Sequence, residues 1–365
     1  MSGTQRGNRT DRSGGQWAYI GSFTSGGGRG ITVAAVDPVT GALVPDSAID
    51  PLVNPSCLTL APDTGVLYAV SETEQGAVGA FRHGDEGLTA LGPVVEVGAS
   101  GPTHLSVAGN LLLTANYTSG SVGSLRVAAD GSPAGPATVF AHRGSGPDAD
   151  RQEGPHAHQV LPDPSGQWVL SVDLGTDSVR VCAPDGATGE LRGHAETVLR
   201  AGSGPRHLAF HPDGETVYVL HELEPQLTVC RWDPASGRLD PLSEIAIGSD
   251  GVPDGVRLYP SVVCVAPQGR FVWAAVRGSN TLLTFSLADG PDKPRLTDSV
   301  ECGGSWPRDL VSDPTGRRLY VANEWSGDVT WFDVDPESGQ LRRAGAVPVP
   351  AAACVVFSRS ATRVK

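Results

Sequence analysis

Residues 204–248 read GPRHLAFHPDGETVYVLHELEPQLTVCRWDPASGRLDPLSEIAIG. Apolar and polar residues alternate in four short runs, which are separated by turns such as HPDG (211–214) and DPASG (233–237). Alternation with a period of two is typical of a half-buried strand, and short Gly, Pro and Asp turns join strands that run antiparallel. The segment therefore predicts one four-stranded antiparallel sheet.

A loop proline precedes a comparable apolar strand seven times along the 365 residues. These prolines are Pro55, Pro102, Pro155, Pro205, Pro260, Pro307 and Pro350, separated by 47, 53, 50, 55, 47 and 43 residues. A period near fifty indicates an array of similar sheets, and four-stranded units arranged radially form a β-propeller. We predict an all-β fold, a seven-bladed β-propeller of four-stranded antiparallel blades.

The two ends of the chain are predicted to share one blade. YIGSF (19–23) resembles the second strand of the other units, but no first strand precedes it. AAACVVFS (351–358) has the pattern of that missing strand, so we expect it to complete the blade begun by residues 17–50. The expected domains are a disordered leader over 1–16, one propeller over 17–358 and a C-terminal tail over 359–365.

Composition excludes several classes of function. The formal net charge of −13 argues against nucleic acid as a partner, because nucleic acid is bound mainly through Lys and Arg. No stretch approaches the roughly 20 apolar residues of a membrane span. The six cysteines form no CxxC pair and no spacing typical of a metal site, so we expect free thiols in a reducing cytoplasm. We also expect no metal and no other cofactor.

Polar residues are predicted to meet at one rim of the ring. In an antiparallel hairpin the start of the first strand lies beside the end of the second, which pairs Arg206 with Glu222. The first strand is innermost, so this rim adjoins the central channel. The other candidates at this rim are Asn54, Glu72, His104, Asn116, His156, His158, Asp173, His207, Arg277, Arg308 and Asn323.

Imidazole, guanidinium and carboxylate groups beside one channel mouth can bind a small anion and transfer protons. Structural alternatives exist for each type. A histidine after a turn proline often bonds the backbone. Asn116, Asp173 and Asn323 occupy equivalent strand ends where they would cap loops, and Arg206 with Glu222 would form a structural ion pair. PHAH (155–158) also leaves a metal site open, although alternate strand residues point to opposite faces. Convergence at one rim favours a functional site.

The chain resembles the lactonase family of seven-bladed propellers, which includes cycloisomerase-type 6-phosphogluconolactonases and the fungal carboxy-muconate lactonising enzyme. The matching stretches include YIGSFTSGGGRGI, LLTANYTSGSV, RQEGPHAHQVLPDPSGQWVLSVDLGTDSV, GSGPRHLAFHPDG, VYVLHEL, APQGRFVWAAVRGSNT and GGSWPRDLVSDPTGRRLYVAN, which together extend from about residue 17 to 358.

The resemblance implies catalytic roles for one histidine of PHAH, His156 or His158, and for Arg206, Glu222 and Arg277. An asparagine is common in the family before the last arginine, whereas this chain has Val276. It implies a small anionic lactone as substrate, held by Arg206 and Arg277 with Arg308 as a further candidate, and hydrolysed with His158 or Glu222 as base. The reverse type of reaction, cyclisation of a muconate-type acid, and a non-catalytic binding platform carrying Trp306 and Trp325 remain alternatives.

Overall fold

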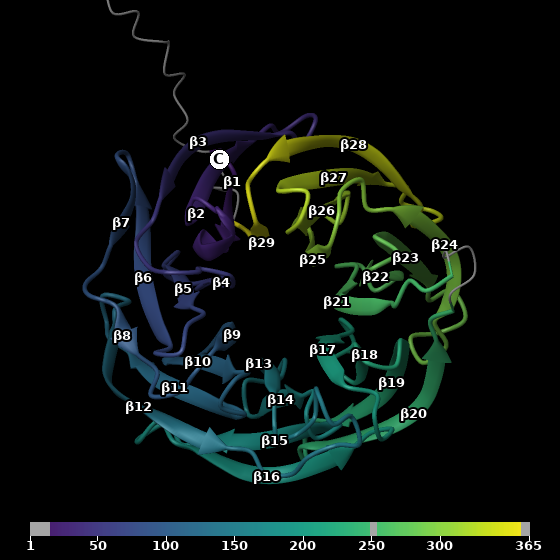
Figure 1. Cartoon of the computed structure of the whole chain (residues 1–365), viewed down its shortest axis with the longest axis horizontal. Coiled ribbons are helices and arrows are strands. Elements are labelled where there is room, and N and C mark those ends of the chain that lie inside the picture. Colours follow the sequence, from purple (N-terminus) through teal and green to yellow (C-terminus); the bar gives the residue numbers. More distant parts are fainter. Residues whose placement is uncertain (1–14, 249–253, 359–365) are drawn as a thin grey trace, which may run out of the picture.

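Seven antiparallel sheets stand around one central axis in the computed structural model, as the repeat predicts (Figure 1). The structure describes residues 15–248 and 254–358. The predicted tail and all but the last two residues of the predicted leader lie outside these ranges. Within them, no helix is long and apolar enough to cross a bilayer.

Each blade runs from an innermost to an outermost strand. The first blade contains β29 (Ala352–Phe357), β1 (Trp17–Ser22), β2 (Ile31–Val36) and β3 (Leu43–Ile49), with the short 3-10 helix η1 (Thr24–Gly26) after β1. The second contains β4 (Leu58–Leu60), β5 (Leu67–Ser71), β6 (Ala77–Gly84), β7 (Gly87–Ala90) and β8 (Val95–Glu96). The third contains β9 (Pro102–Ala108), β10 (Leu111–Asn116), β11 (Ser121–Val127) and β12 (Pro133–Ala141).

The remaining four blades follow the same order. The fourth contains β13 (Ala157–Pro162), β14 (Val169–Asp173), β15 (Ser178–Pro184) and β16 (Leu191–Val198). The fifth contains β17 (Pro205–Phe210), β18 (Thr216–His221), β19 (Gln226–Asp233) and β20 (Arg238–Ala246). The sixth contains β21 (Tyr259–Val265), β22 (Phe271–Arg277), β23 (Thr281–Ser286) and β24 (Arg295–Glu301), and the seventh β25 (Pro307–Ser312), β26 (Arg318–Asn323), β27 (Asp328–Val334) and β28 (Leu341–Pro348).

The second blade departs from the predicted pattern in its outer strand. Both β7 and β8 pair with β6, so two short pieces replace one continuous strand. Gly92 has φ 149° in the interruption, and Pro93 follows it without an N–H to donate. The break therefore has a local cause in the sequence.

The predicted closure of the ring is confirmed. The C-terminal strand β29 lies beside β1 (Figure 1). The two strands pair antiparallel, with Ile20 opposite Val355. Asp309 of the seventh blade also accepts a hydrogen bond from the Val355 backbone N–H at 2.8 Å. The last strand is thus held on both sides, by its own blade and by its neighbour.

Apolar side chains between adjoining blades form the core. Seven buried clusters occur in the described chain, and each joins two neighbouring blades. In one of them Trp273 of the sixth blade packs with Leu319 and Phe332 of the seventh. Because each blade buries its faces only against its neighbours, stability depends on completing the ring.

Candidate active site at the channel mouth

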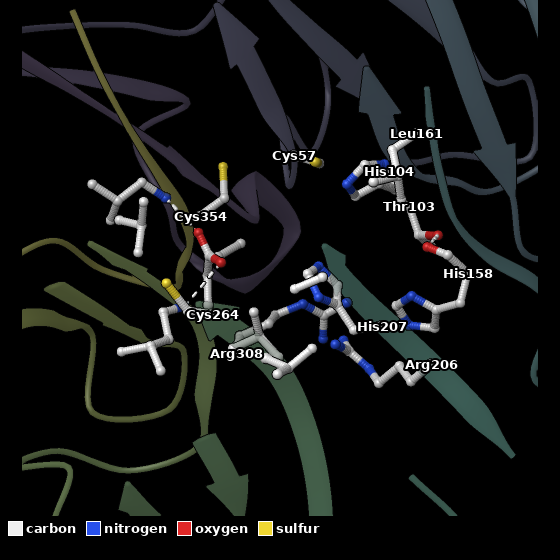
Figure 2. Close-up of a pocket in the computed structure, with 18 of the residues that line it drawn as sticks. Cys57, Thr103, His104, His158, Leu161, Arg206, His207, Cys264, Arg308 and Cys354 are labelled. Carbon is white, nitrogen blue, oxygen red and sulfur yellow. Dashed lines mark hydrogen bonds between the residues drawn. The ribbon is translucent and has the colours of Figure 1, made fainter. Parts of the chain in front are cut away.

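A cavity of about 460 Å³ occupies the central channel and is lined by the inner strands (Figure 2). His158, Arg206 and Arg308 point into it from three different blades. All three sit at the same irregularity, because the pairing register of the inner strand shifts at that residue in each blade. A β-bulge redirects a side chain, which explains how these residues reach the channel.

Glu222 is surrounded by three arginines at the mouth. Its Oε2 lies 2.9 Å from Arg206 Nε and accepts a hydrogen bond from Arg277 Nη2 at 2.6 Å. Its Oε1 accepts a hydrogen bond from Arg151 Nη2 at 2.8 Å. The predicted trio of Arg206, Glu222 and Arg277 is therefore brought together, and a fourth residue joins it.

The arginines set the charge state of this carboxylate. Burial alone would raise the pKa of Glu222, but the charges of Arg277 and Arg206 outweigh burial and lower it far below the ordinary value. Burial and the neighbouring Arg277 lower the pKa of Arg206. The cluster holds more positive than negative charge, so it is suited to receive a further anion.

His158 lies in the same cavity as a neutral imidazole. Burial lowers its pKa well below the ordinary value, and the charge of Arg206 lowers it further, while Glu222 acts in the opposite direction. Its ring makes no hydrogen bond within the described ranges, and its edge faces the ring of Tyr117 at 5.6 Å between centroids. A neutral, unengaged imidazole is the form that accepts a proton.

Arg308 belongs to a neighbouring cluster with two carboxylates. Its Nη1 donates to Glu324 Oε2 at 3.1 Å, and its Nη2 lies 3.9 Å from Glu72 Oε1. Ser56 in turn donates a hydrogen bond to Glu72. This cluster has two carboxylates and one guanidinium, so its net charge is negative.

His104 and His207 lie on the channel wall and face each other edge to face at 6.1 Å. Burial lowers the pKa of both, to about 4 for His104. Gln159 of the fourth blade bonds Nε2 of His207 at 2.8 Å and accepts from the Leu208 backbone at 2.6 Å. These contacts link adjacent blades, so His207 has a structural partner as well as a place on the channel wall.

Four other candidates are bonded within the loops beside the channel. Asp173 Oδ1 accepts from the backbone N–H groups of His156, Gly175 and Thr176, and its Oδ2 lies 2.6 Å from His142 Nδ1. Asn116 donates to Ser121, Asn323 donates to Asp328 and Thr330, and Asn54 bonds Thr24, Ser25 and Glu72.

A shift of one residue explains why these side chains lie apart from the channel. In their own blades, Asn116, Asp173 and Asn323 occupy the strand position that His221 occupies in the fifth blade. Glu222 lies one residue later. Successive strand residues point to opposite faces, so the position one residue later faces the mouth. That later position carries Glu72, Tyr117, Leu174, Glu222, Arg277 and Glu324.

His156 reaches the arginines around Glu222 only through Tyr117. Its Nδ1 lies 3.0 Å from the Tyr117 carbonyl oxygen, its Nε2 lies 3.2 Å from Glu153, and its ring stacks on Tyr117 at 4.4 Å. His156 and His158 therefore have different surroundings, and of the two His158 is the one that lines the cavity.

Aromatic rings flank the arginine side of the mouth. The Arg277 guanidinium lies 5.2 Å from the ring centre of Trp306, and Trp306 stacks on Trp325 at 3.7 Å. Trp306 has φ 63°, a left-handed conformation that is uncommon for a large side chain, and Trp325 is 64% exposed. These rings fix one wall beside Arg277.

Arg151 was not among the residues that the sequence singled out. It lies in the irregular segment between β12 and β13. The signal was present as RQ (151–152) in the stretch shared with the lactonase family, but the segment has no counterpart in the other blades. Tyr117 follows Asn116 in the sequence, and its hydroxyl accepts a hydrogen bond from Arg151 Nη2 at 3.2 Å.

The described residues contain no group of three or more His, Cys, Asp or Glu side chains placed to hold a metal ion. All six cysteines are free. Burial raises the pKa of the Cys57 and Cys264 thiols, which line the channel, to about 12. They are therefore protonated at neutral pH, a form that is a poor metal ligand.

Comparison with known proteins gives a consistent result. The family described as "Lactonase, 7-bladed beta-propeller" matches residues 17–357. A 6-phosphogluconolactonase of Bacillus subtilis is 33% identical over 346 residues, which cover 93% of this chain and 97% of the relative. A 6-phosphogluconolactonase of Formosa agariphila is 28% identical over 337 residues, covering 89% and 94%.

A solved structure agrees with these relatives. The periplasmic gluconolactonase of Pseudomonas aeruginosa superposes with a TM-score of 0.85 at 30% identity, covering 94% of this chain and 99% of the other.

Proposed function

This chain belongs to the lactonase family of seven-bladed β-propellers, and we propose that it hydrolyses 6-phosphogluconolactone to 6-phosphogluconate. The relatives named above act on sugar lactones by their names, and the similarity covers nearly the whole of each chain. The observation that carries the proposal is the meeting of Arg151, Arg206 and Arg277 on Glu222, beside a neutral His158 in the channel. This arrangement supplies both positive charge and a proton acceptor.

The proposed reaction begins with attack of water on the lactone carbonyl carbon. Negative charge then develops on the carbonyl oxygen, and Arg206 with Arg277 stabilises it. Both guanidiniums are buried and held by Glu222, so they need little rearrangement when the charge appears. Glu222 acts in this proposal by orienting the two arginines.

His158 is the proposed base. It accepts a proton from the attacking water and returns it to the ring oxygen when the bond between the carbonyl carbon and that oxygen breaks. Glu222 is less suited to this step, because both of its carboxylate oxygens are already engaged by arginines, whereas the His158 ring has no hydrogen-bond partner among the described residues. General base assistance is typically worth about 10²- to 10⁴-fold in rate.

The remaining candidates receive supporting roles. We propose that Glu72, His104, His207 and Arg308 line the route of the substrate in the channel. Asp173 positions the start of β13 through the His156 backbone, and Asn54, Asn116 and Asn323 hold the loops of their blades.

The setting proposed for this activity is carbohydrate metabolism in the cytoplasm, within the pentose phosphate pathway. The free state of all six cysteines fits a reducing compartment. The proposal includes a single propeller domain over residues 17–358. It involves no nucleic acid, membrane or cofactor.

The test is a steady-state assay of the purified full chain with three substrates. These are 6-phosphogluconolactone, glucono-1,5-lactone and carboxy-muconate, with spontaneous hydrolysis subtracted. The proposal predicts the highest kcat/KM for the phosphorylated lactone. Turnover of carboxy-muconate alone would support the cyclisation reaction instead, and no turnover of any substrate would support a binding platform.

A further inference from the structure

We propose that Arg151 binds the phosphate of the substrate and so determines the preference for a phosphorylated over a plain sugar lactone. This inference rests on the proposed function and assigns a substrate-contacting role to a loop residue outside the predicted set. It concerns specificity, whereas Arg206 and Arg277 serve the reacting carbonyl.

The three arginines contact different carboxylate oxygens of Glu222. Arg206 and Arg277 both contact Oε2, and each has a second backbone acceptor, the carbonyl of Ser261 for Arg206 and that of Tyr259 for Arg277. Arg151 alone contacts Oε1. The first two are thus fixed on the protein, and the third stands apart from them.

Arg151 also keeps donors available. Its bonds to Glu222 and to the Tyr117 hydroxyl both leave from Nη2, so Nε and Nη1 have no hydrogen-bond partner within residues 15–248 and 254–358. Its side chain is 34% exposed, compared with 5% for Arg206 and 7% for Arg277. An arginine that is anchored at one nitrogen and accessible at the others can hold a phosphate by charge-assisted bonds.

The segment that carries Arg151 is fastened to the propeller by the next residue. Gln152 is fully buried, and its Nε2 donates to the Leu174 carbonyl and to Asp177 Oδ1, each at 2.8 Å. Asp177 in turn accepts from the backbone N–H groups of Gly202 and Gly204, just before β17. Arg151 is therefore held in place relative to the strand that carries Arg206.

The other side of the mouth does not suit a phosphate. Arg308 lies between the carboxylates of Glu324 and Glu72, and these would repel a dianion. The cluster of Arg151, Arg206, Arg277 and Glu222 has more positive than negative charge. The phosphate is therefore expected on the Arg151 side, with the lactone ring directed toward Arg206 and His158.

The experiment compares Arg151→Gln and Arg151→Lys with the unmodified full chain. Arg143→Gln is the matched control, because Arg143 is an exposed arginine in the same segment. Two readouts are measured: kcat/KM for 6-phosphogluconolactone and glucono-1,5-lactone, and calorimetric affinity for 6-phosphogluconate and gluconate. The second readout does not depend on turnover.

Arg151→Gln is expected to lower kcat/KM for the phosphorylated lactone, and affinity for 6-phosphogluconate, by about 10- to 100-fold. The values for glucono-1,5-lactone and gluconate should change much less, Arg151→Lys should recover part of the loss, and Arg143→Gln should match the parent.

Equal losses for phosphorylated and plain compounds, or no loss for either, would overturn the role of Arg151. If the parent binds 6-phosphogluconate through Arg151 but turns over no lactone, the proposed function fails while this assignment stands. If the parent hydrolyses 6-phosphogluconolactone, and Arg151→Gln has the same ratio of kcat/KM for this lactone over glucono-1,5-lactone, the assignment fails while the function stands.

Discussion

Replacing Glu222 by Gln removes the charge that three arginines share while it keeps the shape of the side chain. Glu222 is 5% exposed, and its closest partners Arg206 and Arg277 are buried to a similar degree. The variant leaves their two guanidiniums without a counter-charge. Breaking a buried ion pair from one side costs about 3–5 kcal/mol of unfolding free energy.

That cost converts into a measurable change in melting temperature. An unfolding entropy of about 2.1 cal/mol/K per residue, over a chain of 365 residues, gives about 1.3 °C per kcal/mol. The expected decrease in Tm at pH 7 is therefore about 4–7 °C. Turnover of 6-phosphogluconolactone should decrease at least tenfold, because general acid–base and electrostatic contributions are typically this large.

The assay is thermal unfolding of the parent and Glu222→Gln, followed by circular dichroism from pH 7 down to pH 3. Arg206 and Arg277 lower the pKa of Glu222 in the folded state, so the stability it contributes is complete above the unfolded pKa of about 4.3. That contribution is lost as the pH falls through the folded pKa, and the difference in Tm should narrow at acid pH.

Inorganic phosphate provides a second readout from the same samples. With the carboxylate removed, the three arginines form a more positive cluster, so phosphate should raise the Tm of the variant more than that of the parent at equal ionic strength. A variant with unchanged Tm, unchanged turnover and no added response to phosphate would refute the view that Glu222 organises these arginines.

Two further predictions follow from the ring and from His158. Deletion of residues 351–365 removes β29, so cooperative thermal unfolding should be lost; an unchanged Tm would contradict the closure by β29 and β1. His158→Ala should lower kcat at least tenfold. In the parent, burial lowers the pKa of His158, so kcat/KM should stay constant as the pH falls past 6.5 and decrease only at lower pH; a loss beginning above pH 6.5 would count against His158 as base.

The sequence predicted the repeat, the closure and the meeting of Arg206 with Glu222, because these depend on turn positions and strand pairing. HPDG (211–214) lies midway between Arg206 and Glu222, so antiparallel pairing places their backbones at the same rim. The same pairing argument placed Arg277 at this rim, since it occupies the position equivalent to Glu222 in the next blade, and the family resemblance implied its catalytic role.

Other features required the structure. A β-bulge directs His158 and Arg206 into the channel, and the alternation of apolar and polar residues in the sequence does not reveal it. Asp173 and Glu222 differ by one position in the register, and one residue reverses the face of a strand. Arg151 lies on a segment with neither strand periodicity nor a repeat, so its approach to Glu222 depends on the buried anchor Gln152.

We propose that side chains from separate blades form one lactone site at the channel mouth. The most direct test is a crystal structure of the full chain with bound 6-phosphogluconate. We expect the carboxylate of this product beside Arg206 and Arg277, its phosphate on Arg151, and His158 within hydrogen-bond distance. Binding at the opposite face of the propeller, or away from Arg206, would contradict it.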